Sequence, residues 1–269
     1  MPYISYDNVR VGISSLDEQN AGFFYSNPAY AINFNATNSA ALKRVRRIGQ
    51  QMDYYIQTGP KTSNISMTVV PTSGESANQL MDYIGMTGDS VSGSYIHVPN
   101  YLFQKCFLKS LSVNFEPWKV TTANLQFDSY GLANGDGLSS YAAQQQAAKI
   151  ISPLRATSIA ITSASFAQDL NVYESAGFSI QVDRASNYQI GDAYPAKTSV
   201  TKITKTFEVN GISNINWLSD HLPNTSVTAT LTMANSNTFS VAGILSSQTV
   251  SIDANGVAKG TLQIIEEMV

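Results

Sequence analysis

This sequence has few residues of the types that commonly act in catalysis or bind metal ions. The 269-residue chain has one cysteine and two histidines, and charged residues make up only 13% of it. A single cysteine excludes an intrachain disulfide, which fits a chain that folds in a reducing compartment or needs no covalent crosslinks. Sixteen basic residues against 19 acidic ones give a net charge of −3. No basic excess is therefore available to hold nucleic acid electrostatically.

Long hydrophobic runs are also missing. No apolar stretch approaches the ~18–20 residues of a membrane span, and the first residues, MPYISYDNVRVG, lack the charged-then-apolar pattern of a leader. We therefore expect neither a membrane span nor a signal peptide. Serine, threonine, asparagine and glutamine are abundant instead. Such a neutral-polar surface favours close protein contact over mutual repulsion.

The motifs of common enzymes are absent from the sequence. It contains no Gly-x-Ser-x-Gly elbow, phosphate-binding glycine loop or histidine-rich metal spacing. His97 lies in a strand-like segment and His221 follows a predicted helix, so both are expected to be ordinary structural or surface residues. Cys106 stands in an apparent strand, where a small core residue is favoured over a nucleophile. We expect no catalytic residue, no cofactor and no bound metal, and hence no enzyme.

The two halves of the chain have similar sequences, which indicates an internal duplication. Residues 111–127 align without a gap with residues 248–264 at an offset of 137, which pairs Val113 with Val250 and Leu125 with Leu262. Alternating strand patterns also align by chance, but one offset serves most of the half. It further pairs Ile13 with Ile150, Ser15 with Ser152, Val45 with Val182, Arg47 with Arg184 and Gly74 with Gly211. A duplicated unit supplies two copies of one surface, which is more typical of assemblies than of enzymes.

Alternating apolar and polar residues predict strands in both halves. The strand-like segments are 30–34, 63–70 and 101–108 in the first half and 178–182, 199–209 and 227–233 in the second. Two hairpins are expected, one over 111–128 that turns near Pro117 and one over 247–265. The second turns at Asp253-Ala254-Asn255-Gly256, where the Asn-Gly pair supplies the positive φ of a tight turn.

One helix is expected in each half. Thr72 and Glu75 have the spacing of a capping box before an apolar stripe that ends at Gly85. A shorter helical candidate follows Gly211. The predicted fold is therefore mainly β with short helices, in two tandem β-sandwich or barrel domains, each flanked by one helix. The domains are predicted at residues 1–132 and 150–269, with a linker at 133–149.

The densest charge cluster lies in an irregular stretch, residues 41–57. It comprises Lys43, Arg44, Arg46 and Arg47. The cluster predicts contact with an acidic protein surface in preference to DNA, since strand geometry would divide it between two faces. A solvated strand edge is the alternative. Three aromatic residues at expected loops or turns are candidates for subunit contacts or for covering the end of a sandwich, namely Tyr54, Tyr55 and Trp118.

This order of elements resembles the tail-tube family of tailed bacteriophages. That family includes related baseplate hub domains and the type VI secretion tube protein. The resemblance rests on the strand at 63–70, the helix after Thr72 and the hairpin over 111–128, and on their counterparts at 199–209, after Gly211 and at 247–265. It implies β-sandwich or barrel units whose sheets join around a ring, with rings stacked into a hollow tube. It also implies a place in the virion tail, after synthesis in the bacterial host cytoplasm.

Duplication adds a stoichiometry to this resemblance. Two tube units per chain imply homotrimeric, pseudo-hexameric rings, with residues 41–60 as an arm that contacts the next ring. The implied partners are other copies of the chain, a tape measure, a baseplate and a sheath, and DNA would pass through without specific binding. Polar positions on the first predicted hairpin are candidates for the channel wall, namely Asn114, Glu116, Thr122, Asn124, Gln126 and Asp128.

Other functions fit the same sequence pattern. Within the resemblance, a baseplate hub or tube-initiation protein is the alternative to a tube protein. Outside it, a tandem β-sandwich adhesin or fibre module would present an aromatic-lined pocket and would not self-assemble. A hydrolase on a β-scaffold is disfavoured because no catalytic triad or metal set is recognisable.

Overall fold

Strands account for nearly all of the described chain. The computed structural model describes residues 12–14, 31–45, 54–71, 87, 93–98, 101–117, 119–134, 156–163, 166–170, 173–190, 195–212, 223–234, 237–252 and 258–268. Its strands are β1 (Gly12–Ser14), β2 (Ala31–Val45), β3 (Tyr54–Val69), β4 (Ser94–Val98), β5 (Tyr101–Phe115), β6 (Thr122–Asn134), β7 (Ala156–Ser163), β8 (Phe166–Leu170), β9 (Ser175–Asn187), β10 (Lys197–Ile212), β11 (Ser226–Met233), β12 (Thr238–Ile252) and β13 (Ala258–Met268). Those ranges contain no helix, and the predicted helical residues 72–85 and 213–218 lie outside them.

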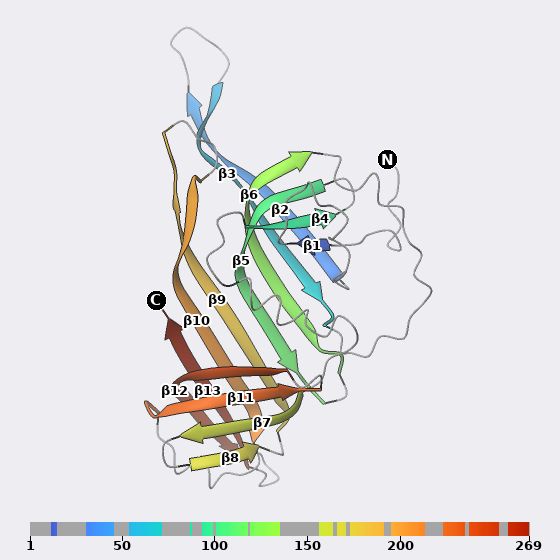
Figure 1. Ribbon diagram of the computed structural model, residues 1–269, viewed down its shortest axis with the longest axis vertical. Helices are drawn as coiled ribbons and strands as arrows, with labels where there is room; N and C mark the ends of the chain where they lie inside the picture. Colours follow the sequence, from blue (N-terminus) through green and yellow to red (C-terminus); the bar gives the residue numbers. More distant parts are fainter. Residues whose placement is uncertain are drawn as a thin grey trace, which may run out of the picture.

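The strands form one antiparallel sheet that runs through both halves (Figure 1). Its order is β2-β3-β6-β5-β9-β10-β13-β12-β11-β7-β8, and β4 pairs with both β5 and β1. The mainly-β prediction is confirmed. The two halves meet where β5 pairs with β9, so they share one sheet. The predicted domain boundary falls near the end of β6, and of the predicted linker only residues 133 and 134 belong to the described chain.

The two halves repeat the same strand order. The first reads β2-β3-β6-β5-β4-β1 and the second reads β9-β10-β13-β12-β11-β7. The β5–β6 and β12–β13 hairpins also share their register, since Leu111 lies opposite Leu125 and Gln248 lies opposite Leu262. Each hairpin even carries a register shift at the same place, between Leu108 and Ser110 and between Leu245 and Ser247. The sequence offset of 137 therefore holds for these hairpins.

That offset is wrong for the other long strands. Met67 lies opposite Leu125, and Val209 lies opposite Leu262, so Met67 corresponds to Val209 and not to Thr204. Likewise Phe34 lies opposite Met67 and Ala176 opposite Val209, so Phe34 corresponds to Ala176. The pairing of Val45 with Val182 consequently fails, because the halves differ in length between their strands. Residues 15, 47, 74, 150 and 152 of the other predicted pairs lie outside the described chain.

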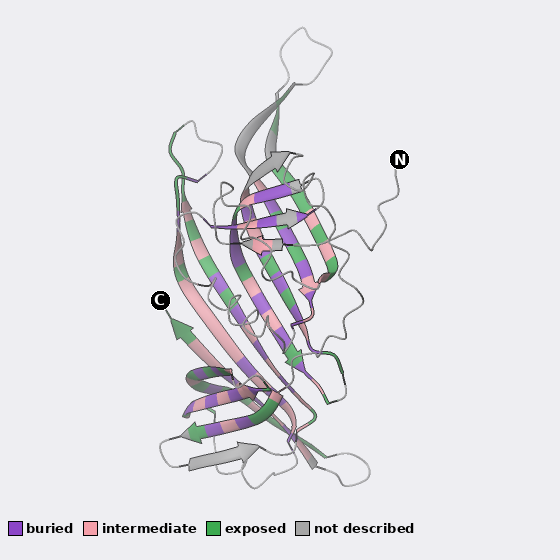
Figure 2. Cartoon of the chain, turned by 45° about the vertical axis from the view of Figure 1, so that its right-hand side comes forward, coloured by how far each residue is buried: buried purple, intermediate pink, exposed green. Residues whose placement is uncertain are grey.

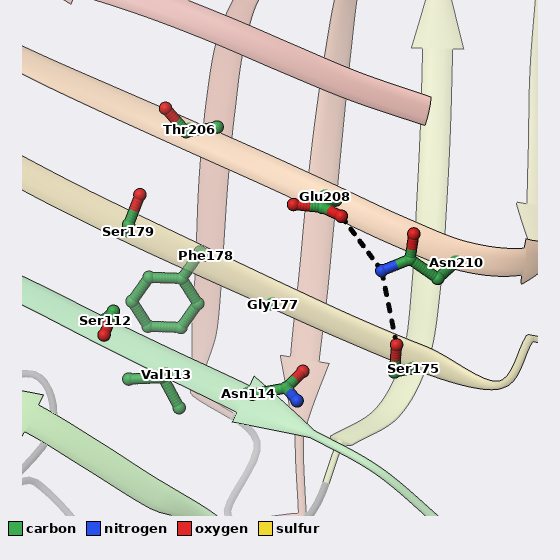
Figure 3. A pocket seen from close by; sticks show the side chains of 10 residues that line it. All are labelled: Ser112, Val113, Asn114, Ser175, Gly177, Phe178, Ser179, Thr206, Glu208 and Asn210. Carbon is green, nitrogen blue, oxygen red and sulfur yellow. Dashed lines mark hydrogen bonds between the residues drawn. The ribbon is translucent and has the colours of Figure 1, made fainter. Parts of the chain in front are cut away.

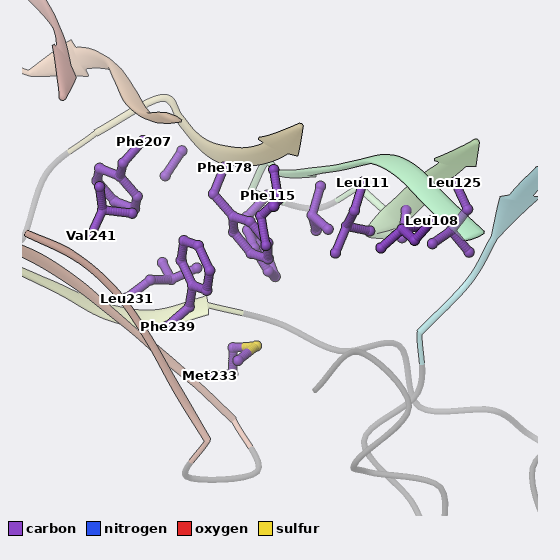
Figure 4. Packing of buried hydrophobic residues seen from close by; sticks show 14 of the residues in the cluster. Leu108, Leu111, Phe115, Leu125, Phe178, Phe207, Leu231, Met233, Phe239 and Val241 are labelled. Carbon is purple, nitrogen blue, oxygen red and sulfur yellow. The ribbon is translucent and has the colours of Figure 1, made fainter. Parts of the chain in front are cut away.

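Buried residues alternate with more exposed ones along much of β3, β5, β6 and β9, whereas β2 has no buried residue among those described (Figure 2). The short strands β11, β7 and β8 cross the long strands at one end of the sheet, and β4 and β1 cross them in the other half (Figure 1). The core fills the space between these layers (Figure 4). At its centre the Phe178 ring of β9 stacks on the Phe239 ring of β12, with centroids 3.9 Å apart.

Within the stretch 41–57, predicted to be irregular, the described residues 41–45 and 54–57 belong to two paired strands. β2 continues to Val45 and β3 begins at Tyr54, with Arg44 opposite Tyr55. The high density of charge hid the strand pattern there. Charged side chains are tolerated on β2 because it lies at the end of the sheet order, where the strand has a neighbour on one side only among the described strands.

Candidate assembly surface

The polar side of the sheet is a single surface that crosses both halves. Its residues alternate along each strand with the buried ones, because successive side chains point to opposite faces. We call it the polar face and define it by Asn64, Ser66 and Thr68 of β3, Ser112 and Asn114 of β5, Thr122, Asn124, Gln126 and Asp128 of β6, Ser175, Gly177, Ser179, Gln181 and Asp183 of β9, and Thr206, Glu208 and Asn210 of β10. The predicted channel-wall positions on β5 and β6 therefore share one face, and Glu116 directly follows β5.

Hydrogen bonds engage several polar side chains on this side of the sheet, and ion pairs neutralise some of its charges. Thr68 Oγ1 donates to Asn124 Oδ1 at 2.8 Å, and Gln181 Nε2 donates to Asp183 Oδ1 at 3.1 Å. The Lys109 ammonium lies 3.8 Å from the Asp128 carboxylate. Burial raises the pKa of Asp128, and the Lys109 charge opposes that increase. The Lys202 ammonium lies 2.7 Å from Glu267, and Lys119 pairs with Glu116. The result is a surface of mainly uncharged hydrogen-bonding groups with a few carboxylates, and it has no basic excess.

The two halves are joined between β5 and β9. Residues Ser110–Phe115 pair with Gln181–Ala176 in continuous register. On the core side of this joint Leu111, Val113 and Phe115 are at most 3% exposed. Beyond the paired residues, the Arg184 guanidinium lies over the Phe107 ring, 5.3 Å from its centroid. Ser186 Oγ also donates to the Tyr130 hydroxyl at 3.2 Å. The joint is therefore as well packed as the interior of either half.

A shallow depression lies on the polar face at this joint (Figure 3). Gly177 contributes no side chain to its lining. An added Cβ there would lie in tight contact, 3.0 Å from the Val113 carbonyl oxygen. On its rim Asn210 Nδ2 donates to Glu208 Oε1 at 3.0 Å and to Ser175 Oγ at 3.4 Å. Three of the polar side chains around it are thus engaged with one another. A depression of this kind suits passing contact with a hydrated surface better than capture of a small ligand.

The predicted contact residues that the structure describes are not among those of the polar face. Lys43 and Arg44 are exposed near the end of β2, and Tyr55 on β3 is 66% exposed. Tyr54 begins β3, whereas Arg46, Arg47 and Trp118 lie outside the described residues. The corresponding β9–β10 hairpin exposes Tyr188 and Ile190 at the same end of the sheet (Figure 1). Sequence reasoning did not single out these two residues, although both stand close to the turn marked by Pro195.

The lone cysteine is a core residue, as predicted. Cys106 is 1% exposed and its Sγ donates to the Phe103 carbonyl oxygen at 3.4 Å. Burial raises the pKa of its thiol to about 12, which keeps the group protonated and unreactive at neutral pH. Across the described ranges, no cluster of three or more histidine, cysteine or carboxylate side chains could hold a metal ion. No helix in those ranges is long and apolar enough to cross a membrane.

Comparison with known proteins gives little beyond this geometry. No protein-family model matches the sequence, and no curated protein matches it. Among solved structures, the chain is similar to the Dit protein of phage SPP1, described as a paradigm of the hub adsorption apparatus in phages that infect Gram-positive bacteria. The similarity covers 97% of this chain and 99% of that one at 8% identity, with a TM-score of 0.27. A TM-score of this size does not establish a common fold.

Proposed function

We propose that this protein is a structural component of a phage tail that assembles into rings around a conduit for DNA. The observation that carries the proposal is the polar face without a basic excess that continues from one half to the other across the β5–β9 joint. A repeated unit joined edge to edge in this way is one arc of a larger sheet. The resemblance of the sequence pattern to tail-tube proteins supplies the biological setting.

The proposed role is mechanical and involves no catalysis. Basic contacts dominate the affinity of proteins for DNA. The Lys109 and Lys202 ammonium groups on this side of the sheet are paired with carboxylates. A wall of this chemistry would let the phosphate backbone move past without holding it. In this proposal the polar face lines the conduit, and the exposed hairpin ends that carry Tyr55 and Ile190 face the next ring or another tail protein.

Electron microscopy of the purified full-length chain, with its mass measured by light scattering, tests the proposal. We expect rings with a mass of three times the 29.1 kDa chain. Stacking of these rings into tubes would favour a tube protein, whereas single rings would favour a hub. A chain that stays monomeric at high concentration would contradict the proposal and would direct attention to the adhesin alternative.

A second prediction concerns the wall of the conduit. The double variant Asn124→Lys, Gln126→Lys should make the assembled protein bind double-stranded DNA, with an affinity that falls steeply as salt is raised, because each new lysine can neutralise a phosphate. Both positions are exposed in the free chain, so folding should be unaffected. DNA retention at several salt concentrations measures the effect.

The matched control for this variant is Thr157→Lys on β7, an exposed position away from the polar face. It adds positive charge without placing it on the proposed wall. Equal DNA binding by assemblies of the control, after correction for the number of lysines added, would argue against the polar face as the lining.

A further inference from the structure

Among the described strands, the outer edge of β2 and the last part of one edge of β12 have no neighbouring strand. These two strands correspond to the two strands that form the internal joint. On one side β2 ends the sheet order, with β3 as its described neighbour. On the other side β12 pairs with β11 only up to Ile244, and no described strand continues along that edge over Thr249–Ile252. In the repeated topology β2 corresponds to β9, and β12 corresponds to β5. The joint between the halves is β5 against β9.

Equivalent residues are buried in β5, which pairs with β9, and exposed in β12, which has no described neighbour at that edge. Val113 and Phe115 in the joint are each 3% exposed. Their counterparts by hairpin register, Val250 and Ile252, are 44% and 71% exposed. All four residues are apolar and lie on the core side of their strands. The open copy thus presents the apolar side chains of a joint to solvent.

Two segments of these edges lack the usual protection against strand addition, since Lys43 and Arg44 of β2 and the register shift at Leu245 and Ser247 of β12 lie beside them. Residues 34–39 (FNATNS) and 247–252 (SQTVSI) contain no charged residue and no proline. Exposed edge strands are normally blunted by lysine, proline or a bulge. Over 34–39 the pairing of β2 with β3 is also free of register shifts, so its outer edge is a regular strand. Both edges are therefore competent to pair with another strand.

We propose that β2 of one copy pairs with β12 of the next copy, in the register that β9 adopts on β5 within the chain. This inference rests on the proposed self-assembly and specifies its interface. Transferring the internal register gives six antiparallel pairs between copies: Phe34 with Ile252, Asn35 with Ser251, Ala36 with Val250, Thr37 with Thr249, Asn38 with Gln248 and Ser39 with Ser247.

The side chains match on both faces of this proposed pairing. On the core side the exposed Val250 and Ile252 meet Ala36 and Phe34, which are themselves only partly buried. The third pair on that side joins two polar residues, Asn38 and Gln248. On the polar side every member is a serine, threonine or asparagine, so the polar face continues unbroken into the next copy. A register slipped by one residue would place polar side chains against the apolar ones. The chemistry of the two edges therefore selects this register.

Cysteine crosslinking tests the pairing directly. Thr37→Cys and Thr249→Cys are both at exposed positions and would face one another across the interface. When the two single variants are mixed and oxidised, we expect a covalent heterodimer. The double variant should give a covalently closed ring in which every chain is linked to two others. Native Cys106 is buried and protonated, so it should not interfere.

The matched control is the pair Asn35→Cys and Ser247→Cys. These residues are exposed and lie on the same face, but the proposed register sets them four residues apart along the strand, about 14 Å at roughly 3.4 Å per residue. Disulfides require Cα atoms within about 7 Å. Crosslinking of the control pair in place of the first pair would overturn the register. Rings or larger oligomers that crosslink through neither pair would overturn the interface while leaving the proposed function in place.

A charge substitution provides an independent readout. Val250→Lys should raise the concentration needed for assembly by about tenfold or more, because an ammonium would be buried in the interface without a partner. Ile244→Lys is the control, since Ile244 is a similarly exposed residue of β12 that lies within the β11-paired segment. Equal assembly of both variants and the parent chain would overturn the interface, and a chain that never assembles would overturn both proposals together.

Discussion

Replacement of Phe178 by alanine is expected to lower the free energy of unfolding by about 3–5 kcal/mol. The side chain is 2% exposed, stacks on Phe239 with centroids 3.9 Å apart and lies 6.4 Å from the centroid of Phe115. Its removal leaves a cavity between β9, β12 and β5, and the rings around it are held by a paired backbone that cannot close the gap. Urea unfolding of the two proteins at one concentration measures the loss.

Phe178→Leu provides the control for this variant. It retains much of the side-chain volume and should lose about 1.5 kcal/mol or less. A loss below about 1 kcal/mol for the alanine variant would show that the site can collapse, and that the two halves are less tightly coupled through Phe178 than the ring contacts indicate.

Gly243→Ala is expected to be the most disruptive small substitution in the described chain, with a loss of about 3 kcal/mol or more. At this point β12 crosses β13 so closely that an added Cβ would overlap the carbonyl group of Ile265. A clash with backbone in a paired strand cannot be relieved by rotating a side chain. The change should therefore separate β12 from β13, or prevent the chain from folding. Soluble yield and urea unfolding report the outcome.

Gly177→Ala is the graded comparison for that variant. The added Cβ there would lie 3.0 Å from the Val113 carbonyl oxygen, which is a tight contact but not an overlap. Its loss should therefore be clearly smaller than that of Gly243→Ala. Equal stability of all three proteins would mean that the two strands separate easily at the crossing.

Local pattern predicted the strands, because burial of one face leaves a period of two in the sequence. Ile65, Met67 and Val69 are buried as their alternation indicated, and the β5–β6 hairpin turns near Pro117 as expected. The strands β7 and β8 were not predicted. Their residues, such as those of ATSIAITS, are mostly small and polar, so the apolar side of β7 is marked by little more than Ile159 and Ile161.

Pairing between distant strands could not be predicted in the same way. The β5–β9 joint brings Val113 next to Phe178. The sequence of neither strand indicates that the other is its neighbour. The shared polarity of Asn114, Asn124 and Gln126 was visible in the sequence, but its continuation onto β9 and β10 follows only from the sheet order. The exposure of Val250 and Ile252 was hidden for the same reason, because their alternation looks like that of a buried strand.

Because the β5–β9 joint lies within one chain, it forms during folding and costs no translational or rotational entropy of association. That cost is on the order of 4–15 kcal/mol for each pair of separate molecules that binds. A ring of six equivalent units built from three such chains would require half as many bimolecular contacts as a ring built from single units. Linkage of the two units also fixes their mutual concentration regardless of dilution. Rings of three two-unit chains should therefore begin to assemble at lower protein concentrations than rings of six separate units with the same edges.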